Sequence, residues 1–308
     1  MLLLLLVPQI SDLTGQAYYI GFFTRVVAFA IAAVSLDLIL GFGGMVSFGH
    51  AAYLGVGAYA LGILLRHGVT NALVHLLVAM AASALVALLI GAVSLRTKGI
   101  YFIMITLAFS QMLYYLGVSL SAYGGDDGMS LPARSDFFGV LDFASDTALY
   151  YFAFGMFVIF FWISRHLVMS RFGVVIRGTK SNERRMIALG YPTYRYQLLA
   201  FVISGAMCGA AGMLLANQAL YVSPSLMQWS RSGELLVMVL LGGMGTLYGA
   251  AVGSLVLMIL EKLLSHVTDH WPIILGLILV TVVRFAKRGI FGWLTQTRPA
   301  HANGKKDG

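Results

Sequence analysis

Residues 35–60 read SLDLILGFGGMVSFGHAAYLGVGAYA, an apolar stretch with four glycines between positions 41 and 49. Inside a helix, glycine costs about 1 kcal/mol relative to alanine, so helices are expected on either side of this cluster rather than through it. Irregular backbone at membrane depth persists only where protein or a water-filled cavity satisfies its polar groups, and transporters line substrate paths with such broken helices. The alternative is an ordinary turn between two helices, and the sequence leaves both interpretations open.

The whole chain shares this apolar character. Of its 308 residues, 59% are hydrophobic and 10% are charged, whereas soluble domains carry about 25% charged residues. Apolar runs of roughly 17–25 residues recur, each long enough to cross a bilayer as a helix, and the short alternating blocks of a membrane barrel are absent. The sequence therefore predicts an all-α, polytopic helical membrane protein with about 8–10 transmembrane or re-entrant helices. These helices are expected near 17–40, 51–65, 71–95, 100–118, 147–164, 196–216, 233–247, 250–264 and 272–284.

The charges predict how the chain is oriented and divided. Its formal net charge is +8, and alternation of the predicted helices places most cations on one side, which the positive-inside tendency assigns to the cytoplasm. This pattern fits membrane topology and no nucleic-acid partner is expected. We expect a multi-pass membrane protein with a transmembrane domain over 1–295, a cytoplasmic C-terminus and a disordered basic tail over 296–308. The cations concerned are Arg96, Lys98, Arg165, Arg171, Arg177, Lys180, Arg184, Arg185, Arg195, Arg284, Lys287, Arg288, Arg298, Lys305 and Lys306.

A basic, Gly-punctuated stretch occupies the middle of the chain between two long apolar runs. Within it, Asn182–Leu189 is compatible with a short helix, with Gly190 as a stop and Pro192 after it. At helical spacing Met186 and Leu189 are expected on one face, with the charged residues elsewhere. Such a segment fits a basic loop attracted to anionic membrane lipid, which the residues alone favour, or a docking surface for a cytoplasmic partner.

The same stretch contains a near match to a phosphate-binding loop. Gly173–Ser181 reads GVVIRGTKS, but Thr179 intrudes between Gly178 and Lys180 and no strand precedes the segment. Nucleotide binding by this chain is therefore not predicted, and the chain is not expected to be an enzyme. Neither a cofactor nor a metal site is predicted, because His266, Asp269 and His270 in one short turn are weak grounds for a metal.

Small residues recur at helical spacing after the glycine cluster and later in the chain. They include Ala51 and Gly55, whose four-residue spacing continues to Tyr59, and Gly205, Gly209 and Gly212 on the run 196–216. Small residues at this spacing let helices approach closely, so helix packing is their expected role. His50 is expected to be a packing residue with its hydrogen bonds satisfied.

Several segments together carry a resemblance to a known family. SLDLILGFGGMVSFGHAAYLGVGAYA resembles the signature of the branched-chain amino acid ABC transporter permeases, of the LivM-type subunit. The similarity continues through the following segments: KGIYFIMITLAFSQM (98–112), GGDDGM (124–129), LLAFVISGAMCGAAGMLLA (198–216) and ELLVMVLLGGMGTLYGAAVGSLVL (234–257). One departure is Asp37, where the family usually has asparagine. A carboxylate there could meet interfacial water, which we favour, or be protonated, or face a polar path.

The resemblance implies that residues 1–295 are the transmembrane permease domain of an ATP-driven importer in a bacterial inner membrane. Its expected substrates are branched-chain or other hydrophobic amino acids, although relatives also carry urea or short amides. The resemblance also implies a heterodimer with a homologous permease, two cytosolic ATPase subunits docking on 171–192, and a periplasmic or extracellular substrate-binding protein. The residues expected to couple to the ATPase are Gly173, Arg177, Asn182, Glu183, Arg184, Ala188 and Gly190. The residues expected on the translocation path are Asp37, Gly43, Gly44, Ser47, Gly49, His50, Gly243 and Gly245.

An ion-coupled secondary transporter is the alternative class. Such a protein needs ionisable residues near the membrane centre. The sequence offers Asp37, Glu234 and Glu261, and all three are expected near the ends of helices.

Overall fold

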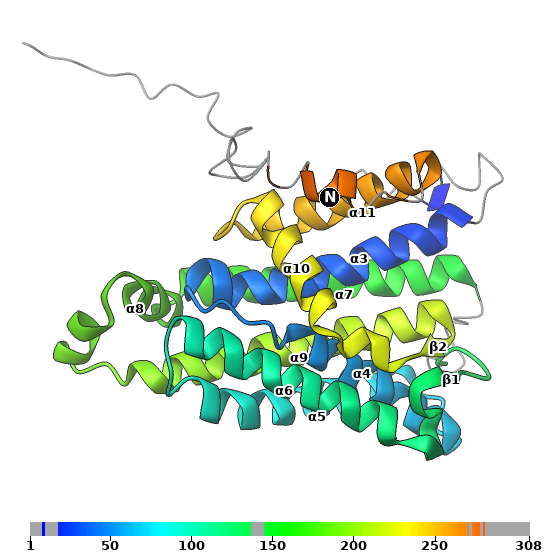
Figure 1. Ribbon diagram of the computed structural model, residues 1–308, viewed down its shortest axis with the longest axis horizontal. Helices are drawn as coiled ribbons and strands as arrows, with labels where there is room; N and C mark the ends of the chain where they lie inside the picture. The colour runs from blue at the N-terminus through cyan, green and yellow to red at the C-terminus, as the bar shows by residue number, and fades with distance from the viewer. Residues whose placement is uncertain are drawn as a thin grey trace, which may run out of the picture.

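The computed structural model describes residues 8–9, 18–136, 145–268, 270, 273–277 and 280 of the chain. These residues are almost entirely helical (Figure 1). The main helices are α3 (Tyr18–Asp37), α4 (His50–Arg66), α5 (Ala72–Ser94), α6 (Ile100–Ser119), α7 (Asp146–Met169), α8 (Arg171–Ala188), α9 (Thr193–Ala219), α10 (Trp229–Gly242) and α11 (Leu247–Val267). The shorter elements are a π-helical turn η1 (Leu38–Phe42), the 3-10 turns η2 (Ser121–Tyr123), η3 (Gly125–Asp127) and η4 (Pro224–Met227), and an antiparallel pair of strands β1 (Met129–Ser130) and β2 (Tyr221–Val222).

The all-α membrane fold predicted from the apolar runs is confirmed. Six of the described helices are long and apolar enough to cross a membrane: α3 with η1, α5, α6, α7, α9 and α11. Eight of the nine predicted helices are present, and the ninth, 272–284, lies largely outside the described residues. The tail 296–308 lies outside them entirely. The predicted helix 233–247 is wrong at both ends, because α10 begins at Trp229 and ends at Gly242.

The long helices run roughly parallel between two ends of the molecule (Figure 1). We call the end that carries α8 the α8 end, and the end that carries β1 and β2 the hairpin end. Helix α3 lies at the centre. Of an apolar 18-residue stretch in each helix, 89% is buried in α3 but only 22% in α6. The outer surfaces of α5 and α6 carry exposed large apolar side chains such as Leu77, Leu89 and Tyr101. These surfaces are suited to contact lipid or another membrane subunit.

Helices α4 and α10 differ from the others because both begin inside the protein. Their N-termini meet where the backbone N–H of Ala51 donates to Ser232 Oγ at 2.9 Å. The neighbouring His50 bonds to Ser204 on α9, eleven residues from the start of that helix, which is roughly 16 Å along its axis. From this meeting point α4 runs toward the hairpin end and α10 toward the α8 end (Figure 1). Each is therefore a half-helix.

The glycine cluster of residues 41–49 is the chain that leads to this meeting point. After η1 ends near the α8 end, residues 44–49 are not helical and run into the interior before α4 begins at His50. Of the two interpretations that the sequence leaves open, the backbone of this segment fits a broken helix and not an ordinary turn between two helices. We call residues 41–49 the first break and residues 243–246, between α10 and α11, the second break.

Small residues bring α4 and α9 into close contact, as predicted. A Cβ atom at Gly57 would collide with the backbone of Gly209, and one at Gly212 would collide with the backbone of Leu54. Gly205 is similarly packed against Ala87 on α5. Because only glycine fits at these crossings, α4 is fixed against the long helix α9 although it spans only part of the protein.

Candidate functional site

The irregular backbone of the first break is held by side-chain hydroxyl groups from other parts of the chain. Phe48 N–H donates to Thr106 Oγ1 on α6 at 3.2 Å, and Gly49 N–H donates to Ser47 Oγ at 3.1 Å. At the adjoining start of α4, the Ala51 N–H is satisfied by Ser232. These partners meet the requirement that non-helical backbone at membrane depth be satisfied by protein.

Asp37 joins the first break to the second. Its Oδ1 accepts a hydrogen bond from the Gly245 backbone N–H at 2.8 Å. Gly41 lies between them, and a Cβ at Gly41 would collide with both Asp37 and Gly245. The carboxyl group is 0% exposed and its Oδ2 has no partner among the described residues, so the expected contact with interfacial water is wrong. The physical reason is that the second break folds directly over the π-helical turn that follows Asp37.

The basic stretch of the sequence forms an arm at the α8 end. We call residues 171–192, which comprise α8 and the turn after it, the basic arm. Its helix is divided at Asn182, whose backbone is extended (φ −158°, ψ 97°) and whose Oδ1 accepts from Arg185 N–H at 3.0 Å. Gly190 ends the second part with φ +85°. The predicted short helix with a glycine stop is therefore confirmed, with Asn182 as its N-cap.

The kink changes which apolar side chains the second part of the arm exposes. Met186 folds back onto Gly178 and is buried, whereas Ile187 and Leu189 are 56% and 65% exposed. The expectation that Met186 and Leu189 share one face is wrong, because the second part of the arm packs against the first. The outward surface of this part combines two apolar side chains with exposed Arg184 and Arg185.

The basic arm contacts the first break through Lys180. The Lys180 amine donates to the Gly41 carbonyl at 2.6 Å, and its aliphatic chain packs against Gly44. The carbonyl is available because the helical hydrogen bonding ends there. Lys180, Gly41, Asp37 and Gly245 therefore form a continuous chain of contacts, which we call the joint, from the basic arm to both breaks.

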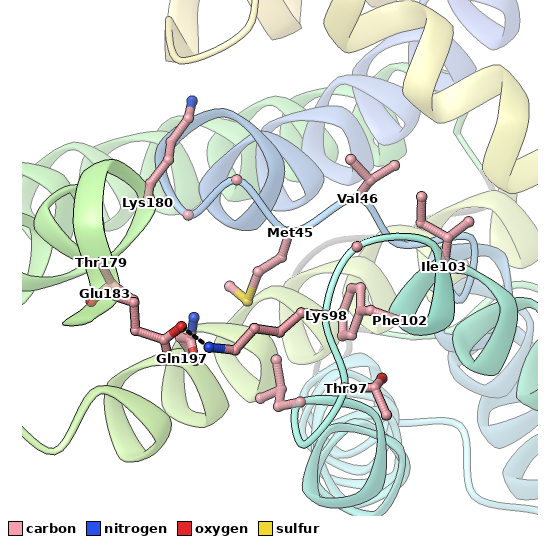
Figure 2. A pocket seen from close by; sticks show the side chains of 14 residues that line it. Met45, Val46, Thr97, Lys98, Phe102, Ile103, Thr179, Lys180, Glu183 and Gln197 are labelled. Atoms are coloured by element: carbon pink, nitrogen blue, oxygen red, sulfur yellow. Dashed lines mark hydrogen bonds and ion pairs between the residues drawn. The ribbon is translucent and has the colours of Figure 1, made fainter. Parts of the chain in front are cut away.

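A second connection links the arm to the loop between α5 and α6. Glu183 forms an ion pair with Lys98, and Thr193 Oγ1 donates to the other Glu183 oxygen at 3.4 Å. A cavity of about 230 Å³ lies between the arm, the first break and this loop. Figure 2 shows Met45 reaching from the first break toward the Lys98–Glu183 pair. The cavity is mixed in character, with charged groups on the arm side and Phe102 and Ile103 opposite.

The structure divides the residues expected on the translocation path into three groups. Gly43 and Gly44 line the cavity at the α8 end. Asp37, Gly243 and Gly245 lie at or beside the joint, while Ser47, Gly49 and His50 are buried at the deep end of the first break. His50 Nε2 bonds Ser204 Oγ at 2.7 Å and the ring packs edge-on against Tyr53 and Phe201, which fits the expected packing role. The expectation that all its hydrogen bonds are satisfied is wrong, because the buried Nδ1 has no partner among the described residues.

The residues expected to couple to an ATPase all lie on the basic arm, but they differ in position. Gly173 is packed against the backbone of Val168 where α7 passes into α8, and Arg177 Nε donates to the Gly173 carbonyl at 3.3 Å. The remaining five belong to the second part of the arm or its stop: Asn182, Glu183, Arg184, Ala188 and Gly190.

Several residues that hold the first break or the cavities were not identified from the sequence. Lys180 was only one of many cations, and Thr106 and Ser232 gave no signal because their partners are distant in sequence. Arg25, a charge inside an otherwise apolar run, could have been singled out. Glu234 was expected near the end of a span, but α10 begins inside the protein, so Glu234 and its ion-pair partner Arg231 lie at depth.

The arrangement can be compared with known proteins. A model of the family described as branched-chain amino acid transport system / permease component matches residues 18–283. The LivM permease proteins of the high-affinity branched-chain amino acid transport systems of Salmonella typhimurium and Escherichia coli are each 26% identical over 299 residues, covering 90% of this chain and 70% of theirs. The LivH permease protein of Escherichia coli is 30% identical over 125 residues, 40% of each chain. No solved structure matches. Because the family match spans most of its length, the chain belongs to the permease components of branched-chain amino acid transport systems and is a multi-pass membrane protein.

Proposed function

We propose that this chain is one permease subunit of a bacterial ATP-driven ABC importer for branched-chain and other hydrophobic amino acids. Family membership supports the substrate class. The similarity of a part of the chain to LivH, as well as to LivM along most of its length, supports a translocation path built with a homologous sister permease.

The α8 end is proposed to face the cytoplasm of an inner membrane. Among the described residues, cations cluster at this end, whereas Asp126, Asp127, Asp136 and Asp146 lie toward the hairpin end. The positive-inside tendency supports this orientation and a cytoplasmic C-terminus. The hairpin end would then receive substrate from an external binding protein.

The importer is proposed to carry two cytosolic ATPases, one docked on each permease. The basic arm is the proposed docking site on this chain. Its second part offers Ile187 and Leu189 as an exposed apolar contact with two arginines beside them. More than half of each of these two apolar side chains is exposed, so the described part of the chain does not bury them. A partner's groove would bury them, as in other helix-in-groove contacts.

The observation that carries the proposal is the joint. A displacement of the arm would act on the Gly41 carbonyl through Lys180 and then on Gly245 through Asp37. Because the first break leads to the meeting point of α4 and α10, ATP-driven closure would shift both half-helices together. Packed interfaces move between discrete arrangements, so a small movement at the joint would switch access between the two ends of the protein.

Reconstitution of the complete transporter tests the proposal. Proteoliposomes with ATP on the α8 side should accumulate radiolabelled leucine, and a proton ionophore should leave the rate unchanged. Uptake that continues without ATP and is abolished by the ionophore would instead support an ion-coupled secondary transporter. Uptake of urea or acetamide in preference to leucine would correct the substrate class while retaining the ATP-driven mechanism.

A further inference from the structure

Two adjoining cavities open into the protein from the hairpin end. The outer one, of about 390 Å³, is lined by Tyr18, Phe22 and the Arg134–Asp146 ion pair, among others. The inner one, of about 290 Å³, extends to Arg231 at the start of α10. Arg25 and Gln218 line both cavities, so they stand where the two meet.

Arg25 is a charged side chain inside a membrane-spanning helix. It lies seven residues from the start of α3, roughly 10 Å along the helix axis. Its guanidinium group lies 5.7 Å from the centre of the Phe29 ring, and it makes no hydrogen bond or ion pair with any residue that the structure describes. An arginine at this depth requires a polar counterpart, so its unused donors indicate a function.

Further charges gather around the inner cavity. Arg231 and Glu234 form an ion pair at 2.8 Å with side chains 33% and 40% exposed, and Glu261 on α11 interacts electrostatically with Arg25, Arg231 and Glu234. Partly exposed charges at membrane depth cannot face hydrocarbon at low cost. This face of α3, α10 and α11 is therefore suited to a water-accessible path.

Part of the lining of the inner cavity is apolar. Phe29, Leu215 and Leu226 line it, with Ser223 and Ser225 beside them. The cavity thus presents a guanidinium group with unused donors, carboxylates nearby and a hydrophobic surface. A multiply charged anion such as phosphate would be repelled by Glu234 and Glu261, whereas a zwitterion with an apolar side chain complements all three features.

From this geometry we infer that the inner cavity is a binding site for an apolar α-amino acid, in which Arg25 binds the α-carboxylate and the Phe29–Leu215–Leu226 wall receives the side chain. A guanidinium–carboxylate contact can be bidentate and is stronger than a neutral hydrogen bond. The inference deepens the proposed function and rests on it. The site lies beside the meeting point of the half-helices, because Arg231 precedes Ser232, the partner of Ala51.

The test measures leucine transported per ATP hydrolysed by the complete transporter in proteoliposomes, with leucine-loaded binding protein at saturation. Arg25→Gln should lower this ratio about tenfold or more, since hydrogen bonds to charged groups contribute that much to binding. ATP hydrolysis stimulated by the loaded binding protein should remain near the wild-type rate, and Arg25→Lys should restore part of the transport. Arg66→Gln is the matched control, because it removes an exposed arginine at the end of α4 that lines neither cavity.

Each other outcome has a defined meaning. An Arg25→Gln transporter with the wild-type ratio overturns the binding site, and so does one from which the sister permease dissociates, because Arg25 would then be a subunit contact. Equal losses in Arg25→Gln and Arg66→Gln would also overturn it. Absence of ATP-dependent leucine uptake in the wild-type transporter would reject the proposed function itself.

Discussion

The two breaks share a sequence pattern but have different structures. Gly43-Gly44-Met45 is followed by extended chain that enters the protein for several residues before α4 begins. Gly242-Gly243-Met244 is followed at once by Gly245, with φ +76°, and the chain reverses so that α11 begins at Leu247. Glycine pairs therefore predict where a membrane helix ends, but the residues after them decide where the chain goes.

The two breaks also differ in what holds them. The first depends on distant partners, among them Thr106, Ser232 and Lys180. Apart from the bond from Gly245 to Asp37, the second is held locally: Thr246 Oγ1 donates to the Gly243 carbonyl at 2.6 Å, and Gly242 packs against Gly249. A segment held by several helices moves when they move, whereas a locally closed turn moves as a unit. We therefore regard the first break as the adaptable element and the second as the rigid one, with Asp37 between them.

Gly41→Val should have the largest effect, because it separates the two breaks. The new side chain would collide with the Gly245 backbone, and overpacking of this kind costs about 3 kcal/mol. Lower thermal stability in detergent and loss of leucine uptake are expected. Gly155→Val on α7, where nothing lies within 4 Å, is the control and should be tolerated. Wild-type stability of Gly41→Val would show that the breaks do not need this close contact.

Asp37→Leu should have the next largest effect, because it leaves the Gly245 N–H without an acceptor. A buried unsatisfied donor costs about 2 kcal/mol, and we expect reduced stability and severely reduced uptake. Asp37→Asn retains the acceptor oxygen and should behave almost as wild type in both assays. If the asparagine variant fails as badly as leucine, the negative charge rather than the hydrogen bond is required.

Lys180→Met tests whether the adaptable break is controlled by the basic arm. Loss of the charged hydrogen bond to Gly41 should lower leucine uptake about tenfold while the protein remains stable. Arg96→Met, which removes another exposed cation at the same end, should leave uptake near wild type. Equal behaviour of the two variants would show that the arm acts on the breaks by another route.

Gly190→Val should have the smallest effect of the four. The positive φ at Gly190 would cost a valine about 1–2 kcal/mol, enough to reorient the exposed part of the arm. We expect normal membrane insertion with uptake and ATPase stimulation reduced several-fold, and Glu183→Trp should uncouple in the same way. Gly68→Val carries the same backbone strain in open space at the hairpin end and should transport normally. Unchanged uptake and ATPase stimulation in Gly190→Val and Glu183→Trp would reject the arm as the coupling element.

The sequence predicted the long helices well because each is a continuous apolar run, and it predicted the short helix of the arm because Asn182 and Gly190 are local signals. It could not predict the depth of the first break, since that depends on hydroxyl groups of α6 and α10 that come together only in the fold. The burial of Asp37 escaped prediction for the same reason, because its partner Gly245 is 208 residues away in the chain.

Chemical labelling with a membrane-impermeant maleimide tests most directly whether the basic arm lies on the cytoplasmic side. Cys208, the only cysteine, is fully buried, so the wild-type protein is a suitable unlabelled background. In intact cells Ser121→Cys at the hairpin end should be labelled, and Arg184→Cys on the arm should be labelled only after the membrane is disrupted. Labelling of Arg184→Cys from outside intact cells would contradict the account, because no cytosolic ATPase could then reach the arm.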